Sequence, residues 1–138
     1  MVQRVSRARA TPGGEIGHGL CVLLGVAAGD DAAAADRVAA KVARLRIFEN
    51  DDRKFDRSLL DVGGAALVVS QFTVIADTGK GNRPSFAGAA RPELAEPLYE
   101  RFCAALEREG IDVARGVFGA RMAIELVNDG PVTIVLDL

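Results

Sequence analysis

An almost unbroken apolar run at residues 19–26, Gly-Leu-Cys-Val-Leu-Leu-Gly-Val, restricts the fold of this chain more than any other feature. A strand with one exposed face alternates apolar and polar residues, whereas a strand without alternation needs cover on both faces. A second run, residues 65–75, is rich in valine and also predicts a strand. Ser70, Gln71 and Thr73 interrupt it where a core strand would carry apolar side chains. The chain is therefore expected to fold around a central strand that is buried on both faces.

The remaining pattern predicts a single α+β domain that spans residues 1–138. Apolar residues at helical spacing predict two main helices, and shorter apolar or alternating runs predict further strands. The expected helices are residues 32–45 and 94–110, and the additional strands are residues 2–10, 111–118, 122–127 and 132–138. Because strands dominate, the sheet is expected to be largely antiparallel and curled towards a barrel. Pro97 sits awkwardly in the second helix, which either begins near Glu96 or has a kinked first turn.

The composition is that of an ordinary globular domain, with 49% hydrophobic and 26% charged residues among 138. The longest apolar run, residues 20–28, is far shorter than the ~20 residues that cross a bilayer. The first residues lack the charged-then-apolar order of a signal peptide, so we expect a cytoplasmic protein with no membrane partner. Cys21 and Cys103 fall in apolar patterns and are expected to be small buried residues rather than parts of a disulfide framework.

The net charge of −2 argues against non-specific binding of polyanions, but the basic residues are unevenly spread. Two groups contain no acidic residue: Arg4, Arg7 and Arg9, and Lys80, Arg83 and Arg91. Such groups permit a nucleic-acid partner without requiring one.

The sequence offers no ordinary side-chain machinery for acid–base or covalent catalysis. Its one histidine, His18, lies between two glycines with no Cys, Asp or Glu at metal-ligand spacing, so neither a metal nor another cofactor is expected. With both cysteines in core patterns, a Ser-His-Asp or Cys-His arrangement has no convincing members. The carboxylates at positions 51, 52, 56 and 61 are interpreted as a charged loop.

Two polar motifs remain, Ser70-Gln71-Phe72-Thr73 and Asn128-Asp129-Gly130-Pro131-Val132-Thr133. Taken alone, the Gly-Pro pair predicts a hairpin turn, because glycine accepts positive φ and proline fixes φ at about −65°. With both motifs present, the chain resembles the D-aminoacyl-tRNA deacylase family. The resemblance covers nearly the whole chain in order, through residues 3–5, 19–26, 45–48, 58–61, 68–73, 76–78, 83–86, 118–122 and 126–133.

The resemblance implies a homodimer that hydrolyses the ester joining a D-amino acid to the terminal adenosine of tRNA, with active sites at the subunit interface. In this family the Gly-Pro peptide is cis, and one subunit inserts it into the pocket of the other, facing the Ser-Gln-Phe-Thr segment. Main-chain carbonyls of Gly130 and Pro131 would then occupy the space of an L side chain and leave a D side chain pointing outward. A site that discriminates by exclusion should accept an amino acid without a side chain, so glycyl-tRNA is also an expected substrate.

The resemblance also implies roles for individual residues. Backbone N–H groups around Phe72 and Thr73 would stabilise the oxyanion, assisted by the ribose 2′-hydroxyl of the substrate, whereas a competing mechanism makes Thr73 a nucleophile with no identifiable base. Ser70 and Gln71 would position the adenosine or the aminoacyl group. The other expected roles are orientation of the Gly-Pro element by Arg4, lining of the pocket by Phe86 and Met122, and contact with acceptor-stem phosphates by Lys80 and Arg83.

The sequence leaves alternatives open. Arg4 can be a plain exposed strand residue, and Phe86 and Met122 can be plain core. The scaffold can also serve a noncatalytic RNA-binding module, or a sister deacylase that removes L-amino acids and would carry a trans Gly-Pro peptide and a wider pocket. The opening strand and the first turn, with residues 11–15 in place of a longer hairpin, are shorter than is usual in the family, which leaves open that edge of the sheet and part of the dimer surface.

Overall fold

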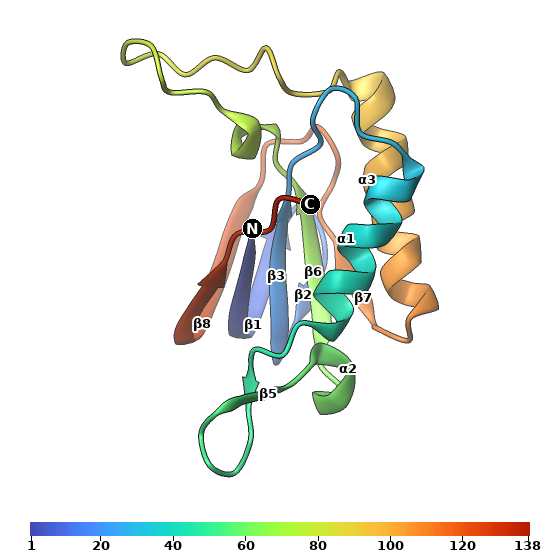
Figure 1. Cartoon of the computed structure of the whole chain (residues 1–138), viewed down its shortest axis with the longest axis vertical. Coiled ribbons are helices and arrows are strands. Elements are labelled where there is room, and N and C mark those ends of the chain that lie inside the picture. The colour runs from blue at the N-terminus through green and yellow to red at the C-terminus, as the bar shows by residue number, and fades with distance from the viewer.

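The computed structural model describes all 138 residues as one curled sheet with helices packed against it (Figure 1). Its elements, in chain order, are β1 (Val2–Thr11), β2 (Glu15–Ile16), β3 (Gly19–Leu24), α1 (Ala32–Arg44), β4 (Phe48–Glu49), β5 (Phe55–Arg57), α2 (Leu59–Val62), β6 (Ala65–Ser70), the 3₁₀ helix Phe72–Ile75, α3 (Pro92–Arg108), β7 (Val113–Arg115) and β8 (Ala123–Ile134). None of these helices has the length and apolar character that crossing a bilayer requires.

The main sheet has the order β2-β1-β3-β6-β7, and β8 pairs with β1 off this path. β1 is antiparallel to β2, β3 and β8, whereas the β3–β6 and β6–β7 pairs are parallel. The parallel pairs arise where helices connect the strands, because a helical crossover returns the chain to the end of the sheet from which it left. The predicted single α+β domain with a curled and mainly antiparallel sheet is confirmed, with a parallel centre.

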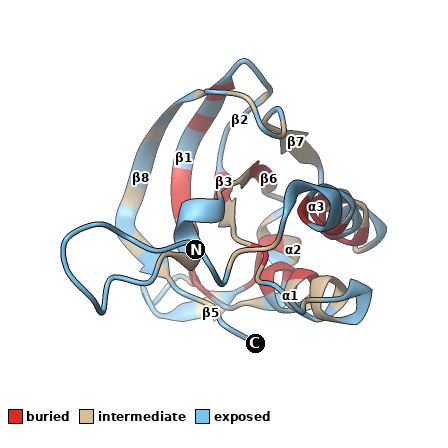
Figure 2. Cartoon of the chain, turned by 90° about the horizontal axis from the view of Figure 1, so that it is seen from above, coloured by how far each residue is buried: buried red, intermediate tan, exposed pale blue.

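The central strand β3 is buried on both faces, as predicted. Leu20 and Val22 belong to the core cluster between the sheet and α1 and α3, which lie side by side along one face (Figure 2). Cys21 points the other way and packs with Leu67 and Val69 of β6 in a second cluster. The absence of alternation in the run therefore reflects two cores, one on each side of the sheet.

The two predicted helices are present, with a difference at the start of the second. α1 begins after Asp31, whose carboxylate accepts a hydrogen bond from the Ala34 amide at 2.8 Å. α3 begins at Pro92, so of the two alternatives the start near Glu96 is wrong. Proline suits the first helical position because its missing N–H has no intrahelical partner there. Pro97 lies inside the helix.

α2 is a third, short helix beyond the two predicted. Its signal in the sequence is a capping box: the Ser58 hydroxyl accepts from the Asp61 amide at 3.1 Å, and the Asp61 carboxylate accepts from the Ser58 amide at 2.8 Å. Gly63 ends the helix with φ +64°, a conformation that favours glycine.

Two predicted strands are shorter than expected. The strand expected over residues 65–75 ends at Ser70, and Phe72–Ile75 form a 3₁₀ turn in its place. The strand expected over residues 111–118 is reduced to β7. The polar residues that interrupt the valine-rich run therefore mark the end of β6.

The last strand differs most from expectation. The prediction of separate strands at residues 122–127 and 132–138, with a hairpin turn at Gly-Pro, is wrong, because β8 continues without reversal from Ala123 to Ile134. Residues 135–138 lie outside it.

A bulge in β8 carries the Gly-Pro pair. Asn128 pairs with Val5, whereas Thr133 pairs with Gln3, so five residue steps along β8 oppose two steps along β1. The additional residues leave the ladder around Gly130-Pro131. A bulge accommodates proline because the strand needs no ladder hydrogen bond from it there.

Candidate active site

The Ser70-Gln71-Phe72-Thr73 motif lies where β6 ends and the 3₁₀ helix begins. The Gln71 amide donates to the Leu24 carbonyl at 2.8 Å, which holds the motif against the end of β3. The Gln71 side chain donates from Nε2 to Thr73 Oγ1 at 3.0 Å. The structure thus brings the four predicted residues together in one partly exposed turn.

The amide N–H groups of Phe72 and Thr73 have no hydrogen-bond acceptor within the protomer. The first amides of a helix have no intrahelical partner, and no side chain caps this one. Adjacent unpaired N–H donors on a fixed turn are suited to stabilising an oxyanion.

Phe86 lies beside this motif. Its ring centroid is 5.0 Å from that of Phe72, and the two rings meet edge to face at 71°. Phe72 is 57% exposed and Phe86 is 36% exposed. Phe86 is outside the core clusters, so its alternative assignment to plain core is wrong.

Met122 has a packing role. It is partly buried against the second core cluster, and its sulfur accepts a hydrogen bond from the Val117 amide at 3.3 Å. A Cβ on Gly116 would lie 2.8 Å from the same sulfur, so the side chain fills the space beside that glycine. These contacts favour the core alternative for Met122.

The loop of residues 77–90 projects from the body of the protein (Figure 1). Two backbone hydrogen bonds between Asp77 and Ser85, each 2.8 Å, close its base. Lys80 and Arg83 lie exposed between them. This basic group is therefore available to an anionic partner.

The Gly130-Pro131 peptide is cis, as the resemblance implies. Gly130 has φ +127°, and a Cβ there would lie 3.0 Å from Arg4 Nη2 and 2.9 Å from Val132 Cγ2. A larger residue would meet both an unfavourable backbone conformation and a clash. The Gly-Pro element therefore packs directly against the Arg4 guanidinium.

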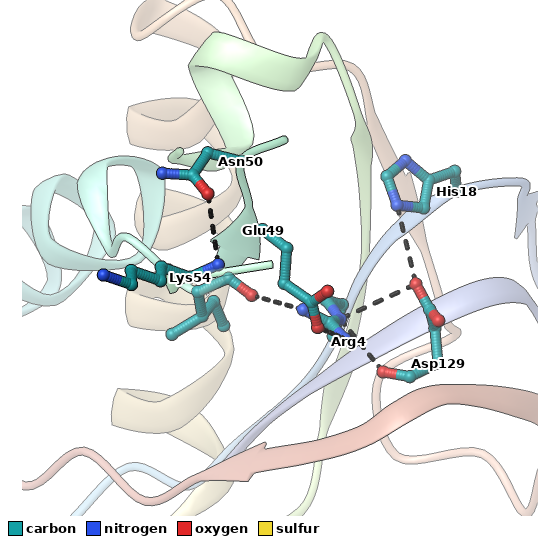
Figure 3. A network of polar contacts seen from close by, with 7 residues as sticks. Arg4, His18, Glu49, Asn50, Lys54 and Asp129 are labelled. Carbon is teal, nitrogen blue, oxygen red and sulfur yellow. Dashed lines mark hydrogen bonds and ion pairs between the residues drawn. The ribbon is translucent and has the colours of Figure 1, made fainter. Parts of the chain in front are cut away.

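Arg4 is only 4% exposed, so its alternative assignment to the surface is wrong. Its Nε donates to the Asp129 carbonyl at 2.9 Å, its Nη1 to the Ile47 carbonyl at 2.8 Å, and its Nη2 to Glu49 Oε1 at 3.3 Å (Figure 3). A buried guanidinium is costly unless its donors and its charge are matched. Acceptors from β8 on one side and the β4–β5 region on the other meet this requirement.

Glu49 and His18 are neighbours of the motif that sequence patterns did not reveal. His18 Nε2 lies 3.9 Å from Asp129 Oδ2 (Figure 3). The His18 ring meets the Phe48 ring edge-on, with 5.3 Å between the ring centroids. Arg4 and Asp129, which are in direct contact, are 125 positions apart in the sequence. No local spacing signals contacts of this range.

Burial makes the cysteines poor nucleophiles. It raises the pKa of Cys21 to about 11 and that of Cys103 to about 11. Because the thiolate is the reactive form, neither thiol is suited to attack at neutral pH. Main-chain donors are therefore the better-placed groups for chemistry at this site.

Within one protomer the two motifs lie towards opposite ends of the sheet. Ser70 pairs with Leu24, whereas Arg4, which contacts Gly130, pairs with Leu20. Four residues of strand correspond to about 13 Å. Figure 1 shows the β5 hairpin, which carries the Arg4 contacts, and the segment after β6 at opposite ends of the molecule. One copy of the chain therefore does not bring the two motifs together.

A mostly apolar cleft of the protomer lies elsewhere. It has a volume of about 380 Å³ and is lined by Leu24, Val74, Ile75 and residues 135–138, among others. None of the four residues of the Ser70–Thr73 motif lines it.

Comparison with known proteins gives one consistent result. A family model described as D-Tyr-tRNA(Tyr) deacylase matches residues 1–137. The D-aminoacyl-tRNA deacylase of Chloroflexus aurantiacus is 57% identical over 99% of this chain and 88% of its own length. That of Deinococcus radiodurans is 56% identical over 100% of this chain and 98% of its own length.

Solved structures share the fold. One described as c-Myc DNA Unwinding Element Binding Protein superposes with a TM-score of 0.91 at 40% identity, over 99% of this chain and 96% of its own. Another, described as a probable eukaryotic D-amino acid tRNA deacylase, superposes with a TM-score of 0.81 at 17% identity, over 94% and 93% of the two chains.

Proposed function

The chain belongs to the D-aminoacyl-tRNA deacylase family, and we propose that it hydrolyses the ester of D-aminoacyl-tRNA at a site completed by a second copy of itself. The observation that carries the shared site is the separation of its two motifs within one protomer. A two-fold axis would place Gly130-Pro131 of one copy opposite the Ser70–Thr73 turn of the other. We expect the enzyme to act in the cytoplasm, where its substrate is made.

Main-chain groups supply the chemistry in this proposal. Water attacks the ester carbonyl, and the N–H groups of Phe72 and Thr73 stabilise the negative charge that develops on its oxygen. Each such donor commonly contributes about 3–4 kcal/mol. The terminal ribose departs with its 3′-oxygen protonated, and its 2′-hydroxyl assists the attack. The unpaired state of both amides supports this assignment.

The selectivity is steric. The carbonyls of Gly130 and Pro131 occupy the space into which an L side chain would project, so an L-aminoacyl ester cannot settle against the oxyanion donors. A D side chain points away from them. The close packing of Gly130 on Arg4 supports a rigid element, as exclusion requires.

Other residues support binding. Gln71 and Ser70 position the adenosine or the aminoacyl group, and Phe86 borders the site through its contact with Phe72. Lys80 and Arg83 bind acceptor-stem phosphates from their exposed loop. Met122 supports the site from the core side.

Glycyl-tRNA is a predicted second substrate, because exclusion of a side chain cannot reject an amino acid that has none. The test is release of free amino acid from D-tyrosyl-, L-tyrosyl- and glycyl-tRNA under matched conditions, with light scattering to determine the oligomeric state.

We expect cleavage of the D and glycyl esters, protection of the L ester, and a dimer. Binding of tRNA without cleavage would instead indicate an RNA-binding module. Protection of glycyl-tRNA while the D ester is cleaved would contradict the exclusion model, and an active monomer would contradict the shared site.

A further inference from the structure

The region around β4 contacts Arg4 but has no part in the mechanism above. We propose that Glu49 is a specificity-determining positioning residue, which holds the Arg4 guanidinium and thereby fixes the Gly130-Pro131 element that excludes L-amino acids. This inference rests on the proposed function, in which that element separates the two substrates.

The first step is the contact between Glu49 and Arg4. Glu49 Oε1 accepts from Arg4 Nη2 at 3.3 Å, and Ile47, two residues earlier, accepts from Nη1 at 2.8 Å. Both terminal nitrogens of the guanidinium are thus held by one short segment. Glu49 supplies the charged acceptor, and charge-assisted hydrogen bonds are the stronger kind.

The second step leads from Arg4 to Gly130. Nη2, the nitrogen that Glu49 holds, is also the atom 3.0 Å from the position of a Gly130 Cβ. Nε of the same planar group donates to the Asp129 carbonyl at 2.9 Å, in the peptide that precedes Gly130. Because the guanidinium is rigid and planar, loss of the Glu49–Nη2 hydrogen bond lets the whole group tilt. Gly130, which packs against it, then loses the contact that restrains its position.

The Asp129 carboxylate offers a competing position. Its Oδ2 lies 3.6 Å from Arg4 Nε, close enough to attract the guanidinium once Glu49 is removed. Such a tilt would move Arg4 towards β8 and disturb the bulge. The Glu49 carboxylate therefore opposes the attraction of the Asp129 carboxylate and keeps the Arg4 guanidinium in its position.

Phe55 makes a second, independent contact with the Arg4 guanidinium. Arg4 Cζ lies 5.9 Å from the centre of the Phe55 ring, in a cation–π arrangement. Phe55 is 53% exposed, so its replacement by leucine leaves the core intact. The Glu49 side chain is itself 42% exposed, so its truncation creates no buried cavity.

The experiment measures kcat/KM for D-tyrosyl- and L-tyrosyl-tRNA in the wild type, E49A, E49Q and F55L. The matched control is E125A, because Glu125 pairs with Arg9 at 2.6 Å across β1 and β8 but on the exposed surface. Thermal unfolding is followed for every variant.

In E49A we expect the D-to-L ratio to fall about tenfold, equivalent to about 1.4 kcal/mol. The fall should come from faster cleavage of the L ester, with the D ester within about twofold of wild type. E49Q, which keeps an oxygen acceptor, should fall between E49A and wild type. F55L should lower the ratio about threefold, and E125A should leave it unchanged.

A wild type that cleaves both esters equally would refute the proposed function and the inference with it. A discriminating wild type whose ratio survives in E49A, or whose two activities fall in parallel, would overturn the role of Glu49 alone. Should E49A fail to fold, E49Q decides: a lower ratio with the D ester still cleaved supports the role of Glu49, and an unchanged ratio overturns it.

Discussion

Replacing Phe72 by proline tests the proposed oxyanion role of its N–H group directly. Proline removes one N–H and is tolerated at the first helical position, which Phe72 occupies. The preceding residue must be extended, and Gln71 already is, with φ −141° and ψ 94°. The helix position and the extended Gln71 both favour tolerance of proline here.

The matched control is F72A, which loses the same aromatic ring but keeps the N–H. The Phe72 ring is 57% exposed and contacts Phe86, so both variants lose that contact equally. The difference between them isolates the donor. Removal of one oxyanion donor commonly lowers kcat about 10²- to 10³-fold, or roughly 3–4 kcal/mol.

The assay is single-turnover deacylation of D-tyrosyl-tRNA by F72P and F72A, with tRNA binding measured in parallel. We expect F72P to be about 10²-fold slower than F72A at equal binding. Equal rates in the two variants would refute the role of this amide, and would direct attention to the substrate hydroxyl as the main source of stabilisation.

Substitutions elsewhere test individual side chains of the site, the exposed loop and α2. T73A should lower kcat about tenfold at most in a single-turnover assay, because the Thr73 hydroxyl makes one exposed hydrogen bond between neutral groups. If Thr73 were the nucleophile, its loss would lower kcat on the order of 10⁶-fold. K80A and R83A should each weaken tRNA binding and reduce the slope of log Kd against log salt concentration by about 1. The D-to-L ratio of kcat/KM should not change. An unaltered salt slope would argue against phosphate contact. S58A should lower the stability by about 1 kcal/mol in thermal unfolding, since it removes the cap of α2. Hydrogen bonds from Ser58 hold the pKa of Asp61 below its usual value. The stability that the ionised Asp61 carboxylate contributes is therefore complete above about pH 4 and is lost as the pH falls through the lower pKa of the folded state. Acid titrations should show the wild type more stable than D61N above about pH 4, and this difference should shrink as the pH falls further.

Local sequence pattern predicted the elements whose boundaries depend on neighbouring residues. The apolar run at β3 indicated burial on both faces, and apolar residues at helical spacing placed α1 within residues 32–45. The same reasoning recognised that the polar Ser70–Thr73 motif interrupts the valine-rich run, but it extended the strand beyond the motif to residue 75. Val74 and Ile75 continue the β-branched pattern into the 3₁₀ helix, so only the pairing of β6 with its neighbours decides where the ladder stops.

Local pattern failed where distant segments decide the conformation. Gly-Pro is typical of a turn, yet β8 passes through it, because the pairing with β1 continues on both sides of the bulge. Arg4 belongs to an arginine-rich stretch that indicates an exposed strand, yet it is buried, because acceptors from Ile47, Glu49 and Asp129 converge on it.

The sequence by itself determined the family, the central strand and the identity of both polar motifs, because these are properties of order and residue type along one chain. Tertiary structure alone decided that the Gly-Pro element is a bulge held by a buried arginine, and that the two motifs lie about 13 Å apart along the sheet. The physical reason is that a buried charge is satisfied by whichever acceptors the fold brings to it, and those acceptors are up to 125 positions away.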